Sequence, residues 1–468
     1  MLHFNLYYLR FFSFLISILC FFNIIYSYYF NLYLNVDSYF YTLLISLFPL
    51  LSFFIKKKEF SKITIYVKIL TVVTGYFFLP FLISLPYYFS IYDISFLSAY
   101  FESISGFTST GFTIFDNIKH LDESLILWRS SSQWIGGLYF LFSILLLIDI
   151  FDDNLKKSLT NFLSFNSSEI FKQSIKLFIF YSLLTFLIFI ILNIFNFRAF
   201  NSFNLALTLI SSGGFLPTNN LSLILPNEIK QTILSLCMLF SFFSLFFIYN
   251  LLVYKQKGIK FIHEDVYLLI YSIMIYSFFF VFADKSINFN SIFLAISSSI
   301  SNIGISLEGT TENYSFIFLI LIIIGGSFFS TSSGLRFIKI YSLIKFSFNV
   351  VKSHFEPKNI HINKLAFSET NLDLKDFYKY FLTVLVFIIS LIILSSLLTI
   401  FGLNVENSFK LSILTLMNTV NSSMTGLNDF NFGDLPYFIK YTLIIFMIIG
   451  RVELLTILIL CKKFFFKN

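Results

Sequence analysis

Long apolar runs separated by short polar segments dominate the chain. Ten runs reach about 20 residues, the length that an α-helix needs to cross the hydrocarbon core of a bilayer. The pattern therefore predicts ten membrane-spanning helices. We expect them near residues 9–31, 36–55, 64–87, 124–150, 173–196, 229–253, 264–283, 313–341, 378–401 and 436–461.

The polar segments between these runs alternate between two kinds. One kind is rich in Lys, and the other contains more acidic residues. Cytoplasmic loops of membrane proteins carry the excess of Lys and Arg, so the Lys-rich segments and both chain termini are predicted to be cytoplasmic. The Lys-rich segments lie at 56–62, 156–172, 255–260, 345–364 and 462–467, and the acid-richer ones at 116–123, 228, 284–312 and 406–434.

Four of the outer segments share a further pattern, in which a semi-apolar stretch of about ten residues is followed by Ser, Thr, Asn and Gly. These stretches, at 95–112, 202–215, 291–305 and 408–422, are too short to span and fit re-entrant half-helices. Non-helical backbone at membrane depth is tolerated only when buried in protein or lining water. We therefore expect an all-α polytopic membrane protein, with an N-terminal two-helix segment (1–62) and four repeats of helix, pore loop and helix around a central cation pore (63–160, 161–262, 263–364 and 365–468).

Four pore loops around one axis can form a filter for a monovalent cation. An extended strand after each half-helix can present backbone carbonyls that replace the water around an ion, and Gly suits the bend because it lacks a Cβ. None of the four strands contains a carboxylate, which disfavours an acidic ring for divalent ions. The candidate filter residues, binding K⁺ or possibly Na⁺ through their carbonyls, are Ser109, Thr110, Gly111, Ser212, Gly213, Gly214, Asn302, Ile303, Gly304, Thr419, Val420 and Asn421.

A candidate gate is formed by two apolar runs, the eighth run, in repeat three, and the last run, in repeat four. The eighth run is interrupted at 325–334 by GGSFFSTSSG, which is long for a helix kink and favours an intramembrane loop. Arg451 and Glu453 lie deep in the last run, where a charge is costly and normally faces a cavity or a partner; snorkelling to the interface is the alternative for the Arg. The candidate gate residues are Gly325, Gly326, Ser330, Thr331, Gly334 and Arg451.

The composition excludes several other classes of protein. Hydrophobic residues make up 57% of the chain and charged residues only 12%, whereas soluble domains carry about 25% charge. The net charge of +7 is explained by cytoplasmic Lys rather than by nucleic-acid binding. We interpret Trp128 as part of an interfacial aromatic belt, with Arg129 snorkelling beside it. The sequence shows no catalytic motif and no His or Cys pair at metal-binding spacing, so we expect no enzyme and no covalently bound cofactor.

Several motifs resemble those of a known family. FESISGFTSTGFT (Phe101–Thr113), WRSSSQWIGGL (Trp128–Leu138), ISSGGF (Ile210–Phe215) and GRVELLT (Gly450–Thr456) are similar to segments of the TrkH type in the Trk/Ktr/HKT superfamily of potassium transporters. The resemblance runs over nearly the whole chain. It implies potassium transport by a homodimer whose protomers each contain a pore, and a cytosolic TrkA-like nucleotide-binding regulatory subunit on the basic face.

The resemblance also implies roles for the interrupted run and the last helix. In the family the former is a gating loop, and the Arg that Arg451 matches lies below the filter. The chain departs from the family in its fourth strand, where Asn421 stands at the place expected for Gly. It also has Ile303 and Ile305 around Gly304, where Thr and Phe are commoner.

The sequence therefore favours a channel-like potassium uptake protein in a bacterial cytoplasmic membrane, in contact with lipid and not with nucleic acid. Alternatives remain open. An H⁺- or Na⁺-coupled symporter would need inverted halves and intramembrane acids, of which Glu453 is the one deep candidate. A Na⁺-permeable variant would share the same filter, and a membrane scaffold without transport would leave the four strands unexplained.

Overall fold

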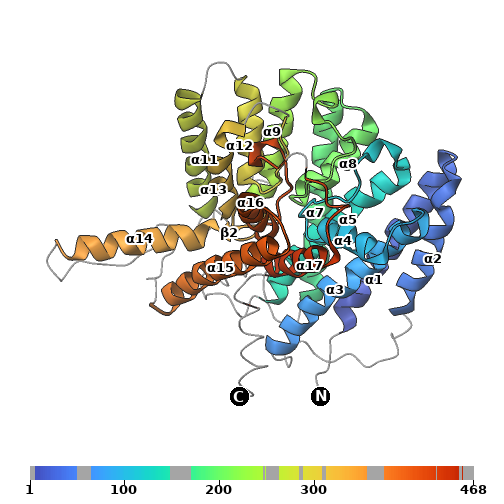
Figure 1. Ribbon diagram of the computed structural model, residues 1–468, viewed down its shortest axis with the longest axis horizontal. Coiled ribbons are helices and arrows are strands. Elements are labelled where there is room, and N and C mark those ends of the chain that lie inside the picture. The colour runs from blue at the N-terminus through green and yellow to red at the C-terminus, as the bar shows by residue number, and fades with distance from the viewer. Residues whose placement is uncertain are drawn as a thin grey trace.

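The computed structural model describes residues 6–49, 65–147, 170–245, 248, 263–283, 288–307, 312–355, 374–427, 430–452 and 456. Glu453 and most of the Lys-rich segments lie outside these ranges. The described part is built almost entirely from helices (Figure 1), which confirms the expected all-α class.

An N-terminal hairpin precedes the repeats. Helix α1 (Leu6–Tyr29) is joined by the short 3₁₀ helix η1 (Tyr33–Asn35) to α2 (Val36–Leu47). The hairpin packs against the first repeat through buried aromatic residues: the Phe12 ring lies 4.8 Å from that of Tyr139, edge to face. Such pairs add stability beyond the apolar area they bury.

A long helix, a 12-residue helix and a further helix then follow one another four times, and the last helix of the third set has only nine residues. The four repeats are α3 (Ile65–Ser90), α4 (Phe96–Phe107) and α5 (Glu123–Leu146); α7 (Ile170–Ile194), α8 (Ala199–Ile210) and α9 (Glu228–Phe242); α11 (His263–Phe282), α12 (Phe289–Ile300) and α13 (Ser315–Ile323); and α15 (Leu374–Ile400), α16 (Val405–Leu416) and α17 (Tyr437–Arg451). Short 3₁₀ helices follow the four pore loops: η4 (Ile118–His120), η7 (Leu221–Leu223), η9 (Glu312–Tyr314) and η10 (Ser423–Thr425).

Five helices in the described residues are long and apolar enough to cross a membrane. They are α1 and the first long helix of each repeat, in the ranges Tyr8–Tyr29, Ile65–Ser90, Gln173–Ile194, Glu264–Phe282 and Phe377–Ile400. The chain is therefore a multi-pass membrane protein. Of the other expected spans, α2, α9 and α17 end close to residues outside the described ranges.

The four short helices α4, α8, α12 and α16 have the same length, 12 residues. At 1.5 Å per residue each is about 18 Å long, so it reaches about halfway through the membrane. Two of their carboxyl ends, those of α4 and α16, are approached closely by long helices through Gly. A Cβ on Gly136 of α5 would lie 1.9 Å from the carbonyl oxygen of Phe107, and one on Gly450 of α17 would lie 2.3 Å from that of Leu416.

The expected eighth span is broken. Helix α13 ends at Ile323, the pairs Ile324–Gly325 (β1) and Leu335–Arg336 (β2) form a minimal parallel ladder, and α14 (Phe337–Ser353) follows. The residues between β1 and β2 form a compact loop, here called the central loop (326–334). Helices α14 and α15 then extend together to one side of the molecule (Figure 1), where the rings of Phe346 and Phe377 lie 4.1 Å apart.

Candidate functional site

The four half-helices end in the same turn. Two residues beyond the last helical residue, each chain enters the left-handed region, at Ser109 (φ 59°), Ser212 (57°), Asn302 (58°) and Asn418 (46°). This conformation is uncommon for residues other than Gly. Four occurrences at equivalent places indicate a built feature, because such strain persists only where the surrounding structure imposes it.

Backbone hydrogen bonds confirm that the four turns are equivalent. The residue after each left-handed position donates its N–H to the carbonyl five residues earlier, over 2.8–3.0 Å. The donors are Thr110, Gly213, Ile303 and Thr419. The next residues along the four strands are therefore also equivalent, and they are Gly111, Gly214, Gly304 and Val420.

The fourth strand is thus set one residue earlier than the sequence analysis expected. Val420, not Asn421, is the counterpart of the three Gly residues, and the strand begins at Asn418, which the sequence analysis left out. Asn421 instead uses its side-chain amide to donate to the carbonyl of Leu427, 3.0 Å away. The sequence contained one signal for this register, because Asn418 has the same residue type and place as Asn302.

Side chains of the turns link the strands in order around a ring. Ser212 donates its hydroxyl to the carbonyl of Ser301, which joins the second strand to the third. The Asn302 amide approaches Thr419 Oγ1 at 3.4 Å, and the Asn418 amide donates to Thr110 Oγ1 at 3.0 Å. The fourth strand therefore lies between the third and the first, and it lies across the ring from the second.

Helix α5 completes the ring between the first and second strands. Gln133 accepts the backbone N–H of Phe215 through Oε1, at 3.3 Å, and a Cβ on Gly213 would lie 2.3 Å from that oxygen. The structure therefore brings together the expected filter residues of the first three strands with Thr419 and Val420, whereas Asn421 follows the ring position and its side chain binds Leu427. The role of Gln133 was missed, although it lies in the quoted WRSSSQWIGGL motif.

The central loop is held against the end of α8 and against α9. Thr331 donates to the carbonyl of Ile210 at the end of α8 (2.7 Å), and the backbone N–H groups of Ser327 and Ser332 donate to Phe242 and Ser241 of α9 (3.0 and 3.1 Å). Five side chains of the loop and its edges, Ser327, Ser330, Thr331, Ser332 and Arg336, are almost fully buried.

Arg336 organises the loop from within. Its guanidinium donates to the carbonyls of Ser327 (3.0 Å) and Ser332 (2.9 Å). Bonds to a charged donor are stronger than neutral ones, so one Arg fixes two separate points of a non-helical segment.

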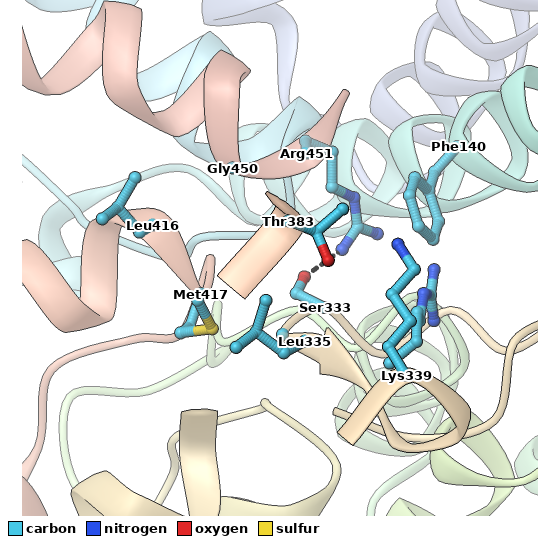
Figure 2. A pocket seen from close by; sticks show the side chains of 11 residues that line it. Phe140, Ser333, Leu335, Lys339, Thr383, Leu416, Met417, Gly450 and Arg451 are labelled. Atoms are coloured by element: carbon cyan, nitrogen blue, oxygen red, sulfur yellow. Dashed lines mark hydrogen bonds between the residues drawn. The ribbon is translucent and has the colours of Figure 1, made fainter. Parts of the chain in front are cut away.

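Arg451 lies between the central loop and the first strand. It is buried, and it donates to Ser333 Oγ of the loop and, at 3.3 Å, to Ser109 Oγ of the strand. Its guanidinium is 4.1 Å from the centre of the Phe140 ring, a cation–π distance. Figure 2 shows it pointing toward Ser333, with Phe140 and Lys339 beside it.

This region contains a small cavity of about 40 Å³. Arg336, Lys339 and Arg451 line it together with the end of α16, at Leu416 and Met417. Three cationic side chains around a confined space make it electrostatically unfavourable for another cation. The alternative of snorkelling does not hold for Arg451, because its side chain is buried within the protein.

A buried ion pair supports the first pore loop and corrects one expectation. Arg129 is not at the interface: it is 1% exposed, and its Nε lies 2.9 Å from Glu102 Oε1 on the half-helix α4. Glu102 also accepts the backbone N–H of Ile114, at 2.9 Å. Trp128 is likewise buried, and it donates to the carbonyl of Ile83. The lone acid within an otherwise apolar half-helix was the sequence signal for this pair.

A second buried acid supports the central loop. Glu264, at the start of α11, accepts the backbone N–H of Phe328 (3.0 Å) and the hydroxyl of Ser327 (3.2 Å). Its neighbour Asp265 accepts the backbone N–H of Ser244 (2.8 Å). Sequence reasoning missed both acids. Their signal was an acidic pair beside a Lys-rich segment, at the start of an apolar run.

Four re-entrant half-helices whose strands form one ring, in a chain that crosses a membrane, define a membrane transport protein rather than an enzyme. Comparisons show which proteins the chain is similar to. The chain is 25% identical to an uncharacterised cation transporter of Methanocaldococcus jannaschii, over 82% of this chain and 80% of that protein. It is also 25% identical to the Trk system potassium uptake protein TrkH of Escherichia coli K12, over 82% and 83%.

The fold agrees with these relatives. The crystal structure of the potassium transporter TrkH from Vibrio parahaemolyticus matches 98% of both chains, with a TM-score of 0.76 and 20% identity. No family model matches the chain. The resemblance to the TrkH type that the motifs indicate is confirmed by these relatives and by this fold.

Proposed function

We propose that this protein mediates channel-like uptake of potassium through the ring of four strands. The observation that carries the proposal is the equivalence of the four turns, each at the end of a 12-residue half-helix. Carbonyl rings of this kind can replace the hydration shell of a monovalent cation. The potassium-transporting relatives support K⁺ as the ion, and Na⁺ permeation is the variant to be tested against it.

The central loop and Arg451 form the proposed gate. Arg451 bonds both the loop and the first strand, so the loop is tied to the filter by a permanent positive charge. Gly325, Gly326, Ser330, Thr331 and Gly334 belong to the same loop and its edges. Opening would require the loop to leave α8 and α9, which breaks the hydrogen bonds described above.

The driving force for uptake would be the membrane potential. With the inside negative, one elementary charge gains about 2.3 kcal/mol per 100 mV. This requires the expected orientation, with both termini in the cytoplasm of a bacterial inner membrane. The proposal also keeps the division of the chain into an N-terminal segment and four repeats. It further includes a homodimeric assembly and a TrkA-like nucleotide-binding subunit on the cytoplasmic face.

The buried acids of the described residues give coupled symport no specific support. Glu102 is paired with Arg129, Glu264 is bound to the central loop, and Asp265 accepts the backbone N–H of Ser244, so all three act as structural acceptors. Glu453 lies outside the described residues. A flux that follows the potential at constant pH and without Na⁺ would separate a channel from a symporter.

The decisive experiment is ⁸⁶Rb⁺ uptake into proteoliposomes loaded with K⁺. We expect concentrative uptake driven by an outward K⁺ gradient, competed by external K⁺ more strongly than by Na⁺. If Na⁺ competes as strongly as K⁺, the proposed substrate becomes any monovalent cation rather than K⁺. Uptake that requires an imposed proton gradient would favour symport, and absence of uptake in both wild type and Arg451→Ala would refute the proposal.

A further inference from the structure

Val420 breaks the fourfold pattern of the ring. The other three strands have Gly at the equivalent position, and in two of them Gly has a positive φ, 84° at Gly111 and 88° at Gly304. Val is the only side chain larger than hydrogen among these four positions. Its direction therefore decides whether the ring is open at this level.

The Val420 side chain points across the ring. A Cβ built on Gly214 would lie 2.4 Å from Val420 Cβ and 2.7 Å from its Cγ1. A Cβ built on Gly111 would lie 3.0 Å from Val420 Cβ and 3.1 Å from its Cγ2. One methyl group thus points toward the first strand, which is a neighbour of the fourth strand. The other points toward the second strand, which lies across the ring from Val420.

The space that the isopropyl group occupies is the middle of the ring. The Cβ position of Gly214 is also 3.1 Å from the carbonyl oxygen of Ile303 on the third strand, and that of Gly111 is 3.0 Å from the Cα of Gly214. These points are therefore surrounded by residues of all four strands. Val420 is not fully buried, so part of it is reached from outside.

The backbone of Val420 remains part of the ring. Its N–H donates to the carbonyl of Ile303, at 3.4 Å, and a Cβ on Gly304 would lie 2.5 Å from its carbonyl oxygen. The equivalent N–H groups of Gly111 and Gly304 instead donate to carbonyls of their own half-helices, those of Ser105 and Ser298. The strand otherwise follows the same course as the others. What differs is the apolar group that it places between their carbonyls, and apolar constrictions oppose ion passage by excluding water.

We propose that Val420 is a hydrophobic constriction within the filter, which limits the rate of cation passage and sets its dependence on ion size. The inference rests on the proposed function, because it assigns the ring as the ion path. In the structure described here the isopropyl group must move aside before an ion can contact all four strands at this level. A smaller side chain should therefore increase flux and weaken discrimination against larger cations.

The test is flux through purified protein in liposomes, measured with ⁸⁶Rb⁺ and with Cs⁺ under the same gradient. Val420→Gly should raise Rb⁺ flux about tenfold or more and raise the Cs⁺/Rb⁺ ratio, with Val420→Ala between it and the wild type. Asn421→Gly is the matched control, because it creates Gly at the next residue. It should change Rb⁺ flux less than twofold.

The outcomes separate this inference from the proposed function. If the wild type conducts and neither Val420→Gly nor Val420→Ala changes its flux, the constriction is overturned and the transport function remains in place. An increase with Asn421→Gly alone overturns the register. Flux in Val420→Gly but not in the wild type supports both the constriction and the transport function. Absence of flux in every one of these proteins overturns both proposals.

A second measurement covers the case in which Val420→Gly does not fold. Val420→Cys places a thiol where the methyl groups are, so external Ag⁺ should block its Rb⁺ flux by at least 80% while leaving Asn421→Cys and the parent protein largely unaffected. Equal Ag⁺ sensitivity of Val420→Cys and the parent protein overturns the proposed direction of the side chain.

Discussion

Arg451→Ala should increase the flux of cations, because Arg451 adds both a charge and a hydrogen bond to the path below the ring. Its Nη2 is 3.3 Å from Ser109 Oγ. A cation bound near that hydroxyl would lie about 6 Å from the guanidinium, where two unit charges repel by about 3 kcal/mol at an effective dielectric constant of about 20. This corresponds to about a hundredfold in rate if the whole repulsion acts at the barrier.

Two further variants separate the charge from the hydrogen bond. Arg451→Lys keeps the charge, and Ser333→Ala keeps the charge but removes the loop partner of Arg451. If repulsion dominates, Arg451→Ala increases ⁸⁶Rb⁺ flux by tenfold to a hundredfold, and both other variants stay within a few fold of the wild type. If the hydrogen bond dominates, Ser333→Ala matches Arg451→Ala.

The reasoning about Arg451 would be refuted by one clear result. Arg451→Ala protein that purifies normally, with a thermal midpoint near that of the wild type, and yet conducts no faster than the wild type would exclude a barrier role.

Three further predictions concern the supports of the site. Glu102→Ala should lower the free energy of unfolding by about 3–5 kcal/mol, because it leaves Arg129 buried without its partner; a thermal melt in detergent checks this, and a loss below 1 kcal/mol would contradict it. Gly450→Ala should cost about 1–3 kcal/mol by overpacking, measured against Ile445→Ala on the exposed face of α17, and equal melts for the two would contradict the close approach to α16. Glu264→Ala should raise basal ⁸⁶Rb⁺ flux several-fold, because the central loop loses two hydrogen bonds to α11, whereas unchanged flux in a stable variant would remove Glu264 from the gate.

The repeat architecture could be predicted from the sequence because it depends on length and hydrophobicity. Half-helices of 12 residues cannot span a bilayer, so the stretches before Gly111, Gly214 and Gly304 could only be re-entrant. The break in the eighth run was also predictable, since a Gly- and Ser-rich segment gains little as a helix. Both features are local, and local patterns are what a sequence shows directly.

The register of the fourth strand could not be predicted in the same way. Val420 and Asn421 were both within the expected strand, but the choice between them depends on where α16 ends. Gly450 packs against that end, at Leu416, which is a contact between distant segments that a local pattern does not show. Burial of Arg129 is a similar case, because its partner Glu102 lies 27 residues away and belongs to a different helix.

The four strands belong to one chain, and this permits a ring whose positions differ in function. In a ring of four identical subunits, Val at the Gly position would place four isopropyl groups between the carbonyls, and an Arg below the strands would bring four charges together. Here Val420 occurs once, Arg451 bonds only the first strand, and the central loop follows only the third. A single constriction and a single charge can slow passage without closing it, so each should be removable by one substitution. Val420 adds to the barrier within the ring and Arg451 to the barrier below it, so removal of one group leaves the other to limit the flux. The double variant Val420→Gly/Arg451→Ala should therefore conduct faster than either single variant; flux no greater than that of the faster single variant would show that the other group does not limit passage.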